Sequence, residues 1–211
     1  MYKLSGRIST VIGAAFLAAA SATATVAVTG QGAEAAVTRT SFEMVPAIGA
    51  TGCLPAAQAN VSIESRGSVD VMKVSAVGLP PDTDFTLFVT QVPSAPFGLA
   101  LYVGDLVTGR NGHAHGTFVG RFNIETFIVA PGVAPAPVVF NGAFPDASSN
   151  PPTNPVQLYH LGVWFNSPTD AAAAGCSANE TPFNGEHDAG VQVLSTRNFP
   201  IESGPLRQIG S

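Results

Sequence analysis

The chain has 211 residues, of which 45% are hydrophobic and 11% charged, less than half the roughly 25% charged residues of an ordinary soluble domain. Nine lysines and arginines face fourteen aspartates and glutamates, and the formal net charge is −5. A mildly acidic chain without a basic run lacks the electrostatic footprint of a nucleic-acid-binding protein and the polybasic patch that binds anionic lipid. Its 22 glycines, 17 prolines and 13 phenylalanines favour many short strands and turns over long helices.

Residues 1–36 have the pattern of a secretory signal peptide. Lys3 and Arg7 form a positive start, and the apolar run Val11–Ala20 follows. The small-x-small pattern at Ala33–Ala35 is typical of a signal peptidase site. We therefore expect cleavage next to this pattern, at the end of the 36-residue segment.

Cleavage there leaves residues 37–211, a length that suits a single domain. An earlier cut at Ala20–Ala22 fits the same rule. An uncleaved membrane anchor is the alternative, because the uncharged stretch could span a bilayer. Its second half, however, is rich in threonine, glycine and alanine rather than leucine and isoleucine. We expect a secreted or otherwise extracytoplasmic protein with no transmembrane segment after signal removal.

The chain has two cysteines, Cys53 and Cys176, and both lie in the exported part. An even count in an exported chain favours a disulfide. A redox-active thiol pair is the alternative, but such a pair normally has a Cys-x-x-Cys spacing or electropositive neighbours, which this sequence lacks. We expect a structural bridge that closes a loop of about 124 residues and stabilises the fold by up to roughly 5 kcal/mol.

Beyond the leader, hydrophobicity alternates with the period of two that is typical of strands. Strands about every ten residues with no helices between them predict an all-β fold, an antiparallel β-sandwich of immunoglobulin-like or jelly-roll-like type. The candidate strands are Val37–Val45, Asn60–Ser65, Val69–Val77, Phe85–Val92, Leu99–Val107, His113–Phe122, Thr126–Ala130, Pro137–Phe140, Val156–Phe165 and Val191–Thr196.

Three local features modify this pattern. Asn111-Gly112 predicts a tight hairpin, because both residues tolerate a positive φ. Pro168–Ala174 is the one short helix that we expect, with Ser167 as its N-cap. The strand Val69–Val77 changes phase in its middle, which indicates a bulge or a strand covered on both faces.

The stretch Val69–Phe122 contains two further patterns. They are Val77-Gly-Leu-Pro-Pro-Asp-Thr-Asp-Phe-Thr-Leu-Phe-Val89 and Gly104-Asp-Leu-Val-Thr-Gly-Arg-Asn-Gly112. This stretch, about a quarter of the chain, resembles the immunoglobulin-like β-sandwich modules of exported bacterial proteins. The resemblance implies a β-sandwich fold and export. It implies almost nothing about chemistry, because such modules have diverse functions.

His113 and His115 form the sharpest candidate for a metal site. Residues two apart share a face of a strand, so both imidazoles could bind one metal ion, with His187 as a third ligand. The phase argues against this, because the phenylalanines at 118 and 122 occupy the opposite face. That aromatic face should be buried, which places the histidines in solvent. A metal ion is therefore the alternative, and we expect no cofactor.

His160 lies in an apolar strand that is predicted to be central in its sheet. We place it on the same face as Leu158 and Trp164 and expect a neutral, hydrogen-bonded core histidine. The alternative is a pH-sensitive group beneath an aromatic side chain.

The sequence contains no Gly-x-Ser-x-Gly, Ser-x-x-Lys or His-Glu-x-x-His motif and no phosphate-binding glycine loop. We therefore expect an exported, non-catalytic protein of the cell envelope or extracellular space, acting by surface binding or as a structural component. A metal-binding protein or metalloenzyme using His113 and His115 is the second hypothesis. A hydrolase whose acidic residues converge only in the fold is the third.

The long proline-rich loop Gly142–Pro155 is the candidate contact surface for a protein or envelope component. Proline restricts φ, so such a loop loses less conformational entropy when it is ordered on a partner. An aromatic side chain flanked by small residues could serve as its apolar anchor. The candidate partner-binding residues are Phe144, Pro145, Pro151 and Pro152.

Overall fold

Eight strands join into one antiparallel sheet in the computed structural model, which describes residues 38–123, 126–131 and 153–209. The order across this sheet is β5-β4-β9-β10-β1-β2-β3-β6, and β7 and β8 form a separate two-stranded sheet. All described residues belong to the unit Ala35–Ser211. The strands are β1 (Thr38–Pro46), β2 (Gln58–Ser65), β3 (Asp70–Val77), β4 (Asp84–Thr90), β5 (Ala100–Val107), β6 (Ala114–Gly120), β7 (Phe127–Pro131), β8 (Thr153–Gln157), β9 (His160–Phe165) and β10 (Gln192–Ser195).

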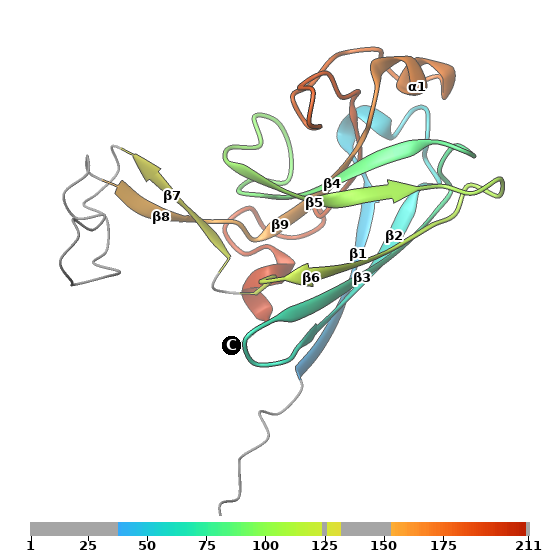
Figure 1. The fold of residues 1–211 in the computed structure, drawn as a ribbon. Coiled ribbons are helices and arrows are strands. Elements are labelled where there is room, and N and C mark those ends of the chain that lie inside the picture. The colour runs from blue at the N-terminus through green and yellow to red at the C-terminus, as the bar shows by residue number, and fades with distance from the viewer. Residues whose placement is uncertain (1–37, 124–125, 132–152, 210–211) are drawn as a thin grey trace, which may run out of the picture. The chain divides into compact units, whose positions relative to one another are not determined.

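Strand β1 joins the two halves of the large sheet. Its residues Thr38–Met44 pair with β2, whereas Val45 and Pro46 pair with β10. Strands β2, β3 and β6 therefore lie on one side of this junction, and β10, β9, β4 and β5 lie on the other. Figure 1 shows β4 and β5 in one layer and β3 and β6 in the other.

The two layers enclose one hydrophobic core. Buried side chains from both halves belong to it, including Ile63 and Met72 from one layer and Leu87 and Val163 from the other. Shared burial of this kind is what holds two sheets face to face. The predicted all-β sandwich is confirmed.

The short helix is also as expected, but the predicted tight hairpin at Asn111-Gly112 was wrong. Helix α1 (Pro168–Ala173) begins after Ser167, whose side-chain oxygen accepts a hydrogen bond from the Asp170 amide. The strands on either side of Asn111-Gly112, β5 and β6, pair with β4 and β3 instead of with each other, and the isolated bridge Thr108–Ala114 is their contact next to the turn. The turn between β5 and β6 contains Gly112 at φ 71°, and a side chain there would collide with the Leu79 carbonyl oxygen. The described part of the chain contains no helix with the length and apolarity for a membrane crossing.

The expected irregularity of the strand Val69–Val77 was wrong. Strand β3 pairs in unbroken register with both β2 and β6, and its residues alternate regularly between inward and outward positions. The apparent phase change arises because Asp70 occupies a buried position at the end of the strand. One oxygen of its carboxylate, Oδ2, accepts a hydrogen bond of 2.7 Å from the Phe122 amide.

The predicted strand Val156–Phe165 is two strands, β8 and β9. The chain leaves one sheet at Leu158, whose amide donates a hydrogen bond to the Thr126 carbonyl, and enters the large sheet at His160. This break changes the alternation, so Leu158 packs into the main core. His160 and Trp164 share the other face of β9, and the expected common face with Leu158 was wrong.

Several predicted features lie outside the described residues. They are the signal peptide (residues 1–36), the strand Pro137–Phe140 and the partner-binding residues Phe144, Pro145, Pro151 and Pro152. The last residues of the loop Gly142–Pro155 belong to β8. These features stay predictions.

His160 is completely buried, and both of its ring nitrogens have partners. Nε2 lies 2.9 Å from the Ile201 carbonyl oxygen, which can only accept, so Nε2 carries the proton. Nδ1 lies 3.0 Å from the Thr196 hydroxyl, which can donate to it. Burial lowers the pKa of His160 below its usual value, although hydrogen bonds to backbone groups act in the opposite direction.

This lowered pKa predicts a pH-dependent stability. The unfolded chain takes up a proton at His160 near pH 6.5, whereas the folded chain does so only at lower pH. The stabilisation is therefore complete above about pH 6.5 and is lost as pH falls from there toward the folded pKa. We expect His160→Asn to remove a slope of up to about 1.4 kcal/mol per pH unit, measured by urea unfolding between about pH 5.5 and 7.5. The exposed His115→Asn variant is the control and should retain the slope; an unchanged slope in His160→Asn would contradict the assignment.

Candidate functional site

The outer face of the β4–β9 layer carries a second hydrophobic cluster, separate from the main core. We call Phe88, Phe97, Trp164 and Phe183 the outer aromatic cluster. Trp164 and Phe183 stack with their ring centroids 4.0 Å apart and their planes at 8°. Phe88 meets Phe183 edge to face at 5.2 Å. These contacts bury the outer face of β9, which an open sheet would expose to solvent.

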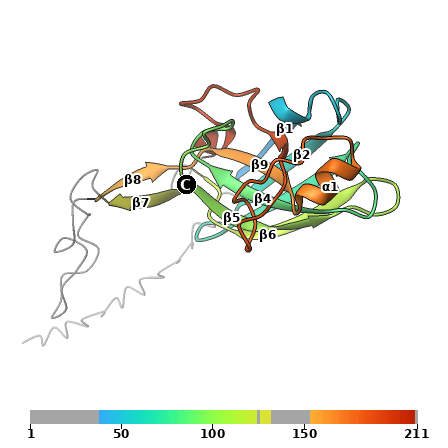
Figure 2. The same ribbon diagram turned by 90° about the horizontal axis from the view of Figure 1, so that it is seen from above.

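The segment Cys176–Val191 supplies Phe183 to this cluster. It follows α1 and passes over β4 (Figure 2), where the buried Thr86 hydroxyl donates a hydrogen bond of 2.5 Å to the Phe183 carbonyl. Farther along, the Gly190 amide donates to the Phe165 carbonyl at 2.9 Å. The segment is thus hydrogen-bonded to the sheet at two points, and its aromatic residue has a defined position.

A tight turn at Asn184–Asp188 extends from Phe183. The Asn184 side chain accepts from the Asp188 amide at 2.9 Å and donates to the Asp188 carboxylate at 2.7 Å. It also donates to the Asn166 carbonyl at 2.9 Å. Within this turn Glu186 and His187 are exposed, and His187 has a positive φ of 63°. The turn therefore presents two polar side chains from a hydrogen-bonded base.

A β-bulge in β5 changes which of its side chains face outward. The pairing of β4 with β5 shifts where Phe88 pairs with Tyr102 and Leu87 with Gly104, which leaves Val103 as the extra residue. An extra residue moves the alternation by one position. As a result, four β5 residues from both sides of the bulge point to the same outer surface, namely Ala100, Tyr102, Asp105 and Val107.

These elements line a groove of about 830 Å³, which we call the β4–β5 groove. Phe88 and Phe183 form its aromatic part, and the β5 residues after the bulge form its open side. The polar lining consists mainly of acidic and amide side chains, with one imidazole. The polar residues are Asp84, Thr86, Tyr102, Asp105, Asn166, Asn184, Glu186 and His187.

Tyr102 is the most exposed aromatic residue of the groove, with 49% of its surface accessible. Its ring contacts Phe88 edge to face at 5.6 Å. Partial burial raises the pKa of the Tyr102 hydroxyl, and the hydrogen bond and negative charge of the nearby Asp105 carboxylate raise it further. The hydroxyl therefore stays protonated and can donate a hydrogen bond at neutral pH.

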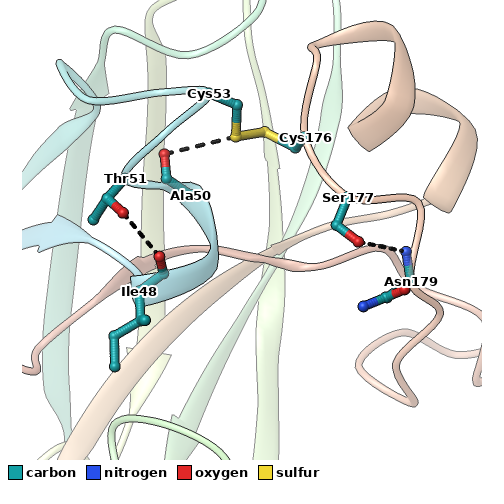
Figure 3. The surroundings of a disulfide bond; sticks show 7 residues. All are labelled: Ile48, Ala50, Thr51, Cys53, Cys176, Ser177 and Asn179. Atoms are coloured by element: carbon teal, nitrogen blue, oxygen red, sulfur yellow. Dashed lines mark hydrogen bonds between the residues drawn. A yellow bond between two sulfur atoms is a disulfide. The ribbon is translucent and has the colours of Figure 1, made fainter.

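A disulfide joins Cys53 to Cys176 at the start of the segment that forms the groove wall. Cys53 lies in the turn after the short helix η1 (Ile48–Ala50), and Cys176 follows α1 closely (Figure 3). The S–S distance is 1.96 Å, and the Cα atoms are 5.2 Å apart. The predicted cysteine pairing is confirmed. The bond ties the start of the groove wall to the turn after β1.

The predicted metal ligands do not converge in the structure. His113 and His115 lie exposed at the start of β6, on the outer surface of the opposite layer, as their phase indicates. His187 lines the β4–β5 groove. Among the described residues, no group of three or more histidine, cysteine, aspartate or glutamate side chains could hold a metal ion.

Sequence reasoning missed the β4–β5 groove. Its residues come mainly from two strands and a loop that lie far apart in the sequence, as the separation of 97 positions between Thr86 and Phe183 shows. No local motif connects them. The sequence did not predict that β5 contributes Tyr102 and Asp105 to one surface, because these residues point to opposite faces of a regular strand. The bulge brings them to the same face. A Tyr-x-x-Asp spacing next to a glycine was the one available signal, and it is weak.

The disulfide yields a stability prediction. We expect the double substitution Cys53→Ala and Cys176→Ala to lower the free energy of unfolding by about 2–5 kcal/mol, because a loop of more than a hundred residues is no longer closed in the unfolded chain. Urea unfolding of the variant and of the oxidised and reduced wild type measures the loss. Identical curves for the oxidised and reduced wild type would show that the bridge does not stabilise the fold.

Comparison with known proteins leaves the chain without an assigned family. No protein-family model matches it, and no curated protein matches it.

Proposed function

We propose that this protein is exported and acts outside the cytoplasm by binding a ligand or partner in the β4–β5 groove. The observation that carries this proposal is the groove itself: about 830 Å³, with aromatic walls and several polar groups directed to one space. Small-molecule and peptide sites typically have volumes of roughly 300–1,000 Å³, an apolar lining and a few polar groups that orient the ligand. The main core does not require this arrangement, since the groove lies on the opposite face of the layer.

Three features support export. The Cys53–Cys176 disulfide is of the kind that persists in oxidising, extracytoplasmic compartments. Residues 1–36 carry the charge and hydrophobicity pattern of a secretory leader. The likeness of Val69–Phe122 to immunoglobulin-like modules of exported bacterial proteins is consistent with both.

The loop Gly142–Pro155 is a second contact surface in this proposal. It retains the argument from its prolines and from Phe144, and it enters β8 at Thr153. A partner seated there would be recognised separately from a ligand in the groove.

Hydrolysis is the second candidate function, because Asp84, Asp105 and Glu186 all line one groove. Glycoside hydrolysis uses two carboxyl groups, one of which must remain protonated to act as the general acid. Burial in an apolar pocket is the usual means of keeping it protonated. All three carboxylates are exposed, so this condition is not met by burial, and we favour binding.

Export is tested on the protein as the cell produces it. We expect the mature protein in the extracytoplasmic fraction, with an N-terminus near Ala36 or Val37, because the peptidase pattern ends there. Cell fractionation followed by N-terminal sequencing measures both properties. Recovery of material that still begins with Met1 would support the membrane-anchor alternative instead.

Binding in the groove is tested with Ala100→Phe, which places a larger side chain on the groove lining. A screen of sugars, peptides and small amphiphiles by protein NMR should give ligands that shift the amides of β4, β5 and the Asn184–Asp188 turn. We expect Ala100→Phe to weaken these ligands at least about tenfold by occupying their space.

The matched control is Val119→Phe, which adds a similar side chain at an exposed position of β6. This variant should bind as the wild type does. Ligand shifts that cluster away from the groove, or undiminished binding by Ala100→Phe, would refute the proposal. Release of reducing sugar that depends on Glu186 or Asp105 would establish hydrolysis in its place.

A further inference from the structure

The β4–β5 groove carries a strong bias of charge. Asp84, Asp105 and Glu186 contribute three carboxylates to its lining, and all three are exposed. Among the described residues, no lysine or arginine lines the groove. Among the described residues, the ion pairs join Glu64 to Arg39 and Arg66. These pairs do not neutralise the charge of the three groove carboxylates. Mutual repulsion of like charges is relieved when a cation enters, so the groove favours cationic over anionic ligands.

An aromatic ring lies beside the carboxylates. Tyr102 is half exposed and interacts with Asp105, so its ring and that carboxylate act on the same region of the groove. The face of an aromatic ring attracts a lysine ammonium or an arginine guanidinium. A cation held by both groups receives an electrostatic and a cation–π contribution together.

The remaining lining is apolar and lies along an end strand of the sheet. Phe88 and Ala100 form part of the floor, and Val107 is 59% exposed at the open side. Among the described strands, β5 pairs with β4 along one edge and is the last strand in the sheet order. An extended peptide laid along this edge could bury aliphatic carbons against these residues and form backbone hydrogen bonds.

We infer that the β4–β5 groove binds an extended, basic peptide segment of a partner protein, with an arginine or lysine side chain between the groove carboxylates and the Tyr102 ring. The inference rests on the proposed binding function of the groove and adds the class of ligand. The aliphatic stem of such a side chain lies against the apolar floor, and its charged end meets the carboxylates. Charge complementarity selects this occupant over an acidic or a neutral one.

The probe is the blocked pentapeptide alanine-valine-arginine-valine-alanine, acetylated and amidated at its ends. The matched controls replace its arginine with citrulline, which has nearly the same shape without the charge, or with glutamate. Binding is followed by calorimetry and by the fluorescence of Trp164, the one tryptophan of the chain, which stacks on Phe183. We expect saturable binding of the arginine peptide, at least about fivefold weaker binding of the citrulline peptide and no binding of the glutamate peptide. Raising the salt from about 0.05 M to about 0.5 M should weaken binding of the arginine peptide.

The protein variants test the carboxylates by near-isosteric removal of charge and test the Tyr102 ring by its removal. We expect the triple variant Asp84→Asn, Asp105→Asn, Glu186→Gln to bind the arginine peptide about tenfold more weakly, and Tyr102→Ala to weaken it more than Tyr102→Phe. Glu43→Gln, at an exposed position of β1 in the other layer, is the control and should bind normally. The citrulline comparison uses only the wild-type protein, so it remains decisive if the triple variant folds poorly.

Each outcome bears on the inference. Equal binding of the arginine and citrulline peptides, or full binding by the triple variant, would overturn it. Free arginine amide that binds as tightly as the peptide would show that the ligand is a small cation and would overturn the peptide assignment. Neutral sugars or acidic ligands that map to the groove would leave the proposed function standing while this inference fails. If nothing binds in the groove, both fail together.

Discussion

The burial of β9 on both faces is the constraint on which the rest of this structure depends. All six residues of the strand are buried, although the sandwich itself covers only one face. Leu161, Val163 and Phe165 face the main core, while His160 and Trp164 face outward and require a second cover. Leaving that apolar surface in water would cost roughly 25 cal/mol for each Å². The segments around Phe97 and Phe183 and the chain after β10 supply the cover.

This cover is held by polar groups as well as by aromatic rings. The Ser195 hydroxyl donates to the Pro93 carbonyl at 2.6 Å, and His160 Nε2 donates to the Ile201 carbonyl at 2.9 Å. Buried polar side chains of β9 and β10 thus donate hydrogen bonds to backbone carbonyls of the covering loops. Because burial disfavours the charged form of His160, the folded structure is sensitive to acid.

The groove arises where this second cover ends. The outer aromatic cluster covers β9 and the adjacent part of β4. It contacts β5 at Ala100 and Tyr102 but leaves the outward side chains of β5 partly exposed. The β5 bulge then aligns Tyr102 and Asp105 on that uncovered surface. The disulfide ties the start of the covering segment at Cys176 to the turn after β1. Residues that cover the outer face of β9, notably Phe183, therefore also line the candidate binding groove.

Local chemistry in the sequence determined the elements that depend on near neighbours. Alternation located most strands within a few residues, Ser167 and Pro168 indicated the helix, Asn111-Gly112 indicated a turn between β5 and β6, and the cysteine count indicated the bridge. The same turn residues wrongly suggested a hairpin, because the two strands that they connect enter different layers. The errors have local causes too. The polar residue Asp70 at a buried position made the alternation of β3 look irregular. The apolar residues around Leu158 made β8 and β9 look like one continuous strand.

Where the strand register shifts, only the tertiary structure decided which face each side chain occupies. It thereby also decided which residues form the candidate site. The phase of Tyr102 and Asp105 depends on the pairing of β5 with β4, and the position of Phe183 depends on its hydrogen bond to Thr86, 97 residues away. Contacts between residues so far apart do not change the hydrophobic alternation around either residue. The sequence pattern therefore gives no sign of them. The sequence by itself therefore determined the fold class, the bridge and the exposed position of His113 and His115. The second cover of β9 and the acidic, aromatic groove at its edge were decided by packing between distant segments.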